Sequence, residues 1–164
     1  MLSAFSLLMV DDLRRIRAIA EYQWGGGSGG ALFPDGVEVE RSKNTGKLRH
    51  FRLGGVLLAS LRASDSLFAL TIHGAMRLVE GAPDFGYCVE VMDDVSEVIS
   101  QGRNVFAKHV VTAGDNIRPG DEVVVVDSKK EVLAVGRALL NAEEMLAFGT
   151  GVAVKTRRGR DEGS

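Results

Sequence analysis

The chain has 164 residues, a formal net charge of −2 and a pI near 5.9. A body of this length buries roughly two-thirds of its unfolded surface, so one medium domain or two small ones fit without disulfide support. The slightly acidic composition lacks the simplest indicator of a nucleic-acid-binding domain, which is a pI above about 9. Net charge averages over the whole surface, however, so a local cluster of Lys and Arg can still attract a phosphate backbone.

The only cysteine, Cys88, lies in an apolar run and is expected to be a small buried hydrophobe. The lack of a disulfide framework predicts a reducing, cytoplasmic compartment. The apolar opening, residues 1–10, is too short to span a bilayer and lacks the basic flank and cleavage site of a secretory signal. We expect it to be part of the fold. Alternatively Met9 is the true start, because helical periodicity begins only at Asp11.

The first half predicts one helix followed by an antiparallel meander. Asp11 or Asp12 can cap a helix that ends near Trp24, with apolar residues at helical spacing. The glycine run at residues 25–30 disfavours regular structure and predicts a mobile loop, and residues 34–36 predict a turn. The expected strands are residues 37–41, 47–53, 56–62 and 67–72, with turns at 44–46 and 54–55 and a short closing helix at 74–79.

Residues 81–84 are the expected domain boundary, because they break both periodicities ahead of a new strand pattern. Beyond them we expect a type II turn at residues 118–121 and a bulge or close backbone approach at Gly136. Many short strands with brief helices predict a small, partly open barrel. The expected strands are residues 88–92, 105–111, 122–127, 132–140 and 151–157. One helix is expected at residues 94–101, where Gly102 ends it. A second helix should begin with a capping box of Asn141 and Glu144 and run to about residue 148.

The fold class is therefore α+β. A helix plus an antiparallel sheet is expected over residues 1–84, and a small β-barrel over residues 85–164.

Stretches of the second half resemble the PUA domain. They are residues 102–108 (GRNVFAK), 117–123 (IRPGDEV), 133–138 (LAVGRA) and 151–155 (GVAVK), and they occur in the order and spacing of that family. The resemblance implies a PUA-type β-barrel from about residue 87 to residue 159.

The PUA resemblance also implies an RNA surface built from the first helix of the barrel, the strand after it and the final strand. A glycine has no Cβ and lets a phosphate backbone approach, while Arg and Lys donate hydrogen bonds to phosphate oxygens. Mapped onto this sequence, the implied RNA-binding residues are Gly102, Arg103, Asn104, Lys108, Lys155, Arg157 and Arg158.

The first half is similar to the domain that precedes PUA in archaeosine tRNA-guanine transglycosylases, on residues 13–23, 42–47 and 59–65. In that family these modules follow a catalytic barrel, and the PUA part grips the acceptor stem of transfer RNA. The sequence shows no counterpart of that barrel, with its catalytic carboxylates and zinc-binding cysteines. We therefore expect no base-exchange activity from this chain.

A second basic candidate lies in the predicted meander. Strand alternation puts Lys47 and Arg49 on one face and His50 and Arg52 on the other, with Arg41 and Lys43 nearby. An ordinary solvated hairpin explains the same pattern, so both interpretations stay open.

Other chemistries find little support. The glycine run is not followed by the Gly-Lys-Ser/Thr of a phosphate loop, and His50, His73 and His109 lack the spacing of a zinc site. Cys88 within a strand is a poor candidate for an activated nucleophile, and no nucleophile elbow occurs. We expect no cofactor, no bound metal and no catalytic centre.

The leading hypothesis is a noncatalytic protein that binds structured RNA. Transfer RNA is the expected target, and the chain would act as a recognition or accessory subunit of archaeosine-type modification. A separate transglycosylase-type protein would then supply the chemistry. The alternative is a ribosome-associated translation factor with a PUA domain. An unrecognised enzyme would need a polar pocket between the domains, and the sequence offers no cluster from which to build one.

Overall fold

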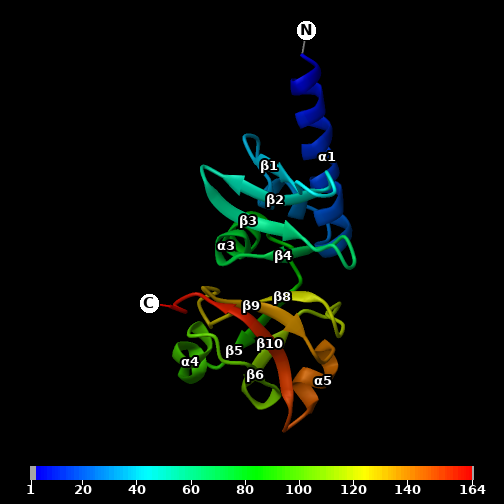
Figure 1. Cartoon of the computed structure of the whole chain (residues 1–164). Helices are drawn as coiled ribbons and strands as arrows, with labels where there is room; N and C mark the ends of the chain where they lie inside the picture. Colours follow the sequence, from blue (N-terminus) through cyan, green and yellow to red (C-terminus); the bar gives the residue numbers. More distant parts are fainter. Residues whose placement is uncertain (1–2, 164) are drawn as a thin grey trace. The chain divides into compact units, whose positions relative to one another are not determined.

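The computed structural model describes residues 3–163, apart from the side chains of residues 5 and 6. The chain forms two compact units, Met1–Phe85 and Gly86–Ser164 (Figure 1). The first unit combines helices with a four-stranded sheet, and the second is built on a six-stranded mixed sheet. Within the described residues, no helix is both long and apolar enough to cross a membrane.

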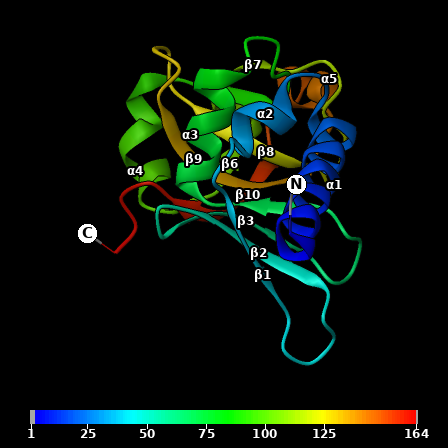
Figure 2. The same cartoon turned by 90° about the horizontal axis from the view of Figure 1, so that it is seen from above.

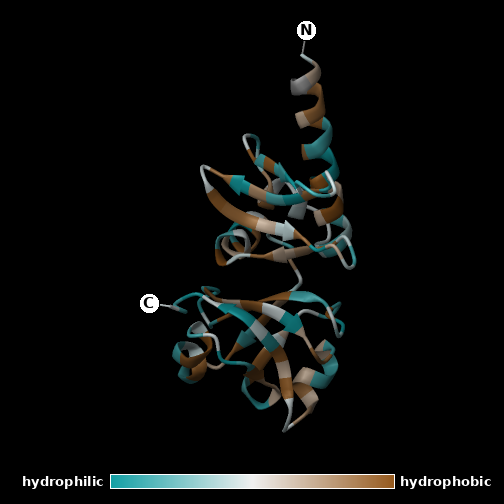
Figure 3. Ribbon diagram, in the orientation of Figure 1, coloured by the Kyte–Doolittle hydropathy of each residue, from teal (hydrophilic) through white to brown (hydrophobic). Residues whose placement is uncertain are grey.

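Helix α1 (Ala4–Trp24) begins earlier than predicted and ends at the predicted residue. The expected caps, Asp11 and Asp12, lie inside the helix, so that prediction is wrong. Asp12 is buried, and its carboxylate accepts a 2.7 Å hydrogen bond from Arg41 Nη2. The helix includes residues 7–10, whose apolar side chains are exposed. Brown, hydrophobic segments appear on the ribbon in the N-terminal part of α1 (Figure 3).

Helix α2 (Ser28–Leu32) occupies much of the glycine run, which corrects the prediction of a mobile loop. Gly29 is buried against α1, and a Cβ there would lie 2.7 Å from the carbonyl oxygen of Arg17. Arg17 Nε also donates a 2.8 Å hydrogen bond to the carbonyl oxygen of Phe33. Gly29 therefore allows two helix backbones to approach closely, and this packing outweighs the poor helix propensity of glycine.

The sheet of the first unit is the predicted antiparallel meander, in the order β1-β2-β3-β4. The turn at Gly36 and the closing helix are also confirmed; Thr71 caps that helix by accepting a 3.1 Å hydrogen bond from Gly74 N. The bounds are β1 (Glu38–Arg41), β2 (Leu48–Leu53), β3 (Val56–Leu61), β4 (Phe68–Leu70) and α3 (Ile72–Gly81).

Buried aromatic rings form the centre of the first unit. Phe33, Phe51 and Phe68 contact one another with ring centroids 5.1 to 5.5 Å apart. The ring of Trp24, at the end of α1, stacks on Phe68 at 6.1 Å. Large rings remove much apolar area from water, so these contacts fix α1 and α2 against the sheet.

The second unit is a nearly closed barrel, as predicted for its class. Its strands follow the order β6-β10-β9-β8-β5-β7; β5 and β8 are parallel, and the other pairs are antiparallel. The bounds are β5 (Cys88–Val91), β6 (Val105–Phe106), β7 (Val110–Ala113), β8 (Glu122–Val126), β9 (Val132–Ala138) and β10 (Val152–Gly159).

The predicted single strand at residues 105–111 is wrong, because a 3-10 turn, η2 (Ala107–His109), divides it. The segment before the turn, β6, pairs with β10, whereas β7 pairs with β5 at the opposite edge of the sheet. One straight strand cannot reach both partners. The break therefore serves to close the barrel.

The helices of the barrel lie close to their predicted positions. A 3-10 turn, η1 (Asp93–Val95), leads into α4 (Ser96–Ser100), and Gly102 ends this segment with φ of 102°. Helix α5 (Ala142–Ala147) begins with the predicted capping box: Glu144 N donates to Asn141 Oδ1 at 2.8 Å, and Asn141 N donates to Glu144 Oε1 at 2.9 Å.

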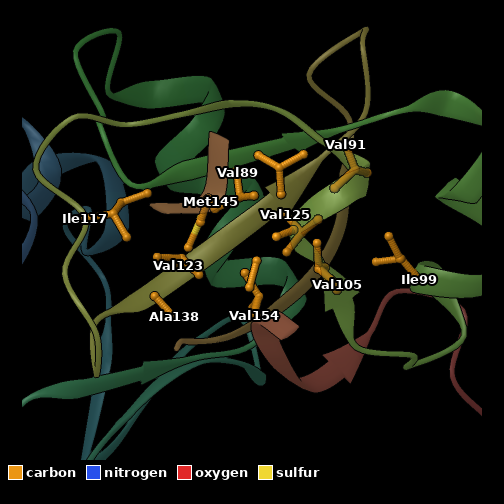
Figure 4. Close-up of a cluster of buried hydrophobic side chains, with 14 of the residues drawn as sticks. Val89, Val91, Ile99, Val105, Ile117, Val123, Val125, Ala138, Met145 and Val154 are labelled. Atoms are coloured by element: carbon orange, nitrogen blue, oxygen red, sulfur yellow. The ribbon is translucent and has the colours of Figure 1, made fainter. Parts of the chain in front are cut away.

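Aliphatic side chains fill the barrel (Figure 4). Val123 and Val125 point inward from β8 toward Met145 of α5 and Ile99 of α4. Gly136 of β9 confirms the predicted close approach, since a Cβ there would lie 2.3 Å from the carbonyl oxygen of Lys155. The backbones of β9 and β10 thus lie too close together at Gly136 for a larger side chain.

Candidate nucleic-acid interface

The loop after α4 is tied to the middle of β10 by two hydrogen bonds. Thr156 N donates to Asn104 Oδ1 at 3.0 Å, and Thr156 Oγ1 donates to the carbonyl oxygen of Arg103 at 2.8 Å. The structure therefore brings the segment 102–104 beside the strand segment 155–158, as the PUA resemblance implies. We call residues 102–104 together with 155–158 the β10 edge.

Within the β10 edge, the basic side chains differ in how they are held. Arg103, Lys155 and Arg158 are exposed. Arg157 is exposed as well, but it forms a bidentate ion pair with Glu122 of β8; Arg157 Nη1 lies 2.7 Å from Glu122 Oε1, and Nη2 contacts Oε2. The Glu122 side chain is fully buried. Arg157 thus balances a buried carboxylate, a role that sequence reasoning missed.

Strand pairing adds a basic residue that the sequence reasoning also missed. Arg137 of β9 is exposed and lies opposite Lys155 of β10. On its other side, Arg137 lies opposite Glu122. The sequence contained this signal, because Arg137 is the one charged residue in the apolar run of β9 and the one exposed position of that strand.

Gly102 faces a carboxylate rather than open solvent. Glu162 Oε2 accepts a 2.9 Å hydrogen bond from Gly159 N, and a Cβ on Gly102 would lie 3.0 Å from Glu162 Cδ. The left-handed backbone of Gly102 ends the α4 segment. A phosphate that approached Gly102 closely would meet the Glu162 side chain first.

Lys108 lies in η2, between β6 and β7, with an exposed side chain. Among the described contacts, no hydrogen bond or ion pair joins it to the β10 edge. The structure therefore brings together the implied RNA-binding residues at 102–104 and 155–158, and it leaves Lys108 on the separate turn.

The second basic candidate divides into paired and unpaired residues. Arg41 contacts Asp12 of α1, and Arg52 Nε lies 3.7 Å from Glu40 Oε2. Lys43, Lys47 and Arg49 are exposed. The sequence pattern alone could not separate these two groups, because their partners lie on other elements.

The residues considered for metal binding or nucleophilic catalysis are dispersed. His50 Nδ1 lies 2.9 Å from Ser60 Oγ, and no group of three His, Cys, Asp or Glu able to hold a metal occurs among the described residues. Cys88 is half-buried, and this burial raises the pKa of its thiol to about 11. The thiol is thus protonated near neutral pH and is a weak nucleophile.

Family models match both units. Residues 87–160 match the PUA domain, and residues 14–84 match the patch-forming domain C2 of tRNA-guanine transglycosylase. The chain joins a C2 domain to a PUA domain. Both resemblances inferred from the sequence are thereby confirmed.

The curated relatives carry the name of the enzyme whose C2 domain model matches the first unit. The chain is 47% identical over 150 residues to the tRNA-guanine(15) transglycosylase of Methanothermobacter thermautotrophicus, covering 92% of the chain and 23% of the relative. It is 49% identical over 144 residues to the enzyme of that name from Thermococcus kodakarensis, covering 88% and 24%. This C2–PUA chain therefore spans about a quarter of the length of these relatives.

Solved structures share the fold over most of the chain. A hypothetical protein from Pyrococcus horikoshii has a TM-score of 0.74 at 22% identity, covering 93% of this chain and 92% of that one. A conserved PUA domain protein from Thermoplasma acidophilum has a TM-score of 0.67 at 21% identity, covering 93% and 91%. At these identities the similarity establishes the fold.

Proposed function

We propose that this chain binds structured RNA, specifically transfer RNA, through the β10 edge of its PUA domain. The main support is that a PUA domain and a C2 domain occur together here at 47% identity to a tRNA-guanine(15) transglycosylase. The geometry adds a loop fixed to a strand, with exposed cations on both. Such an arrangement suits phosphate contacts, which position a protein on RNA without reading its sequence.

The side chains of the β10 edge take different parts in this proposal. Arg103 and Arg158 are exposed guanidinium groups that can fork onto phosphate oxygens, and Lys155 adds a point charge. Arg137, opposite Lys155, extends the basic strip onto β9. Arg157 contributes to the local field while its hydrogen bonds go to Glu122.

We further propose that the chain acts without a catalytic centre of its own, as a recognition or accessory subunit of archaeosine-type tRNA modification in the cytoplasm. The protonated Cys88 thiol and the dispersed histidines support this view. A separate transglycosylase-type protein is the partner that would perform the base exchange.

The test measures binding of transfer RNA to the full chain by fluorescence anisotropy at low salt. The double variant Arg103→Ala/Arg158→Ala should bind about tenfold more weakly and show a shallower salt dependence, because two phosphate contacts are lost. Arg14→Ala/Arg15→Ala removes the same charge from an exposed part of α1 and serves as the matched control. If both double variants bind transfer RNA equally well, the β10 edge is not the RNA-binding surface.

The subunit role has its own test. Affinity purification of the tagged chain from cells should recover a transglycosylase-type protein together with transfer RNA. Co-sedimentation with small ribosomal subunits, without binding of free transfer RNA, would instead support the translation-factor alternative.

A further inference from the structure

A cavity of about 480 Å³ opens between two loops of the C2 domain. One loop, residues 42–47, joins β1 to β2, and the other, residues 62–67, joins β3 to β4. Because neighbouring strands run antiparallel, both loops lie at the same end of the sheet (Figure 2). The volume falls within the range of small-molecule sites, about 300 to 1,000 Å³, and exceeds the needs of a simple inorganic anion.

The wall of this cavity carries positive charge. Lys47 and Arg49 belong to the wall and are exposed, and neither forms an ion pair with any residue that the structure describes. A third cation, Arg62, lies 3.0 Å from Asp65 through Nη2 and Oδ2. No Asp or Glu is found among the described residues of the wall. Two cations without a balancing carboxylate favour an anionic ligand.

Hydroxyl groups on a fixed loop line the same wall. Ser64 and Ser66 belong to the loop between β3 and β4, which is closed by hydrogen bonds from Ser66 N to Arg62 O at 3.0 Å and from Arg62 N to Leu67 O at 2.8 Å. Asp65 Oδ1 accepts a further hydrogen bond from Leu67 N at 3.0 Å. These bonds hold Ser66 at φ of 58°, a region that few non-glycine residues adopt. The backbone that carries the two serines is thus held in one conformation.

Less polar side chains complete the wall. Leu48 and Leu61 lie beside the cations, and His50 adds an imidazole ring. The hydrogen bond between His50 Nδ1 and Ser60 Oγ fixes that ring. A nucleotide combines an anionic phosphate with a sugar and a flat, largely apolar base. Its phosphate can therefore bind the basic side chains, and its sugar and base can pack on the less polar ones.

We infer that this cavity is a nucleotide site that recognises the phosphate group. The phosphate binds Lys47, Arg49 and the serine hydroxyls, and the sugar and base pack on the leucines and His50. The nucleotide belongs either to an RNA chain or to a free mononucleotide, since both present the same phosphate. Of these two ligands, only the nucleotide within an RNA chain depends on the proposed function.

The first arm of the test uses guanosine 5′-monophosphate as the probe, titrated into the isotope-labelled full chain and followed by backbone amide NMR. The nucleotide should shift the amide signals of residues 45–50 and 62–66. Unphosphorylated guanosine should leave them in place, and Lys47→Ala/Arg49→Ala should abolish the shifts. No shift with the nucleotide, or equal shifts with guanosine, overturns the inference.

The second arm measures transfer RNA binding as a function of salt. Lys47→Ala/Arg49→Ala should weaken binding about tenfold and reduce the slope of log affinity against log salt by roughly 1.8, since each phosphate contact contributes about 0.9. The control Arg14→Ala/Arg15→Ala should stay within about twofold of wild type. If both double variants lose transfer RNA affinity equally, the effect of charge is unspecific, and the cavity does not bind a nucleotide of the RNA chain.

The two arms separate the sources of the nucleotide. Nucleotide shifts with unchanged transfer RNA affinity support a free mononucleotide and overturn the RNA source. If the wild-type chain binds the nucleotide but no transfer RNA, the proposed function fails and the cavity site stands. Melting temperatures within about 2 °C of wild type establish that the exposed substitutions leave the fold intact.

Discussion

The two basic regions of the molecule use their charges differently. At the cavity of the C2 domain, Lys47 and Arg49 have no ion-pair partner among the described residues and line the same wall as several serines. At the β10 edge, Arg157 pairs with Glu122, and the carboxylate of Glu162 lies in front of Gly102. A cation in the sequence is therefore available to a ligand only when the fold does not use it.

Arg157→Ala should have the largest effect, because Arg157 balances a buried carboxylate. We expect the PUA domain to lose about 2 kcal/mol of stability, because the fully buried Glu122 carboxylate loses its cation while the partly exposed Arg157 itself gives up little burial. Hydrogen exchange of the β8 and β9 amides measures this loss within one domain of the full chain.

Arg158→Ala is the matched control for that loss. It removes the neighbouring exposed guanidinium and should change stability by less than about 0.5 kcal/mol. If Arg157→Ala is equally mild, the Arg157–Glu122 pair is not structural, and Arg157 returns to the group of cations available to RNA.

Local patterns in the sequence predicted much of the fold. The meander, the capping box of Asn141 and Glu144, and the close approach at Gly136 depend on neighbouring residues or on one residue's size. The proximity of loop 102–104 to β10 followed from the PUA resemblance, because that family fixes the order of the strands.

Long-range contacts account for what the sequence did not predict. Helix α2 forms in the glycine run because Gly29 packs on Arg17 of α1, a contact that the composition of the run itself does not reveal. Pairing of β6 and β7 with different strands requires the break at η2. The ion pair of Arg157 and the site of Glu162 depend on strand register, which no local pattern reveals.

Asn104→Ala should release the loop 102–104 from β10. Loss of the hydrogen bond to Thr156 N should cost about 1 kcal/mol of stability and lower the melting temperature of the PUA domain. Because the loop then loses its fixed position, transfer RNA affinity should fall as well. Thermal unfolding and anisotropy measure the two effects, and Asn116→Ala, an exposed asparagine of the same domain, is the control.

Glu162→Gln tests whether the carboxylate in front of Gly102 opposes RNA binding. The amide oxygen keeps the acceptor for Gly159 N and removes the negative charge. Transfer RNA affinity should rise roughly threefold, in line with about 0.6 kcal/mol for an exposed charge. Glu143→Gln on α5 removes the same charge from an exposed site and should have a smaller effect. Weaker binding by Glu162→Gln would show that Glu162 supports the β10 edge.

The smallest expected effect is the pH dependence of Asp93, a charge that the PUA domain uses for its own fold. Ser128 Oγ and Ser128 N donate to the Asp93 carboxylate at 2.6 and 3.0 Å, and these hydrogen bonds hold its pKa below the ordinary value. A lowered folded-state pKa gives stability that is present above the unfolded pKa, about 3.9, and is lost as the pH falls through the folded value.

Asp93→Ala should therefore lower the melting temperature slightly at pH 7, and the difference from wild type should disappear near pH 2. Asp94→Ala is the control, because the described part of the structure shows no hydrogen bond to the neighbouring Asp94 carboxylate. Calorimetric scans at both pH values measure the difference. A gap between wild type and Asp93→Ala that persists at pH 2 would mean that the side chain stabilises the turn by packing, independently of its charge.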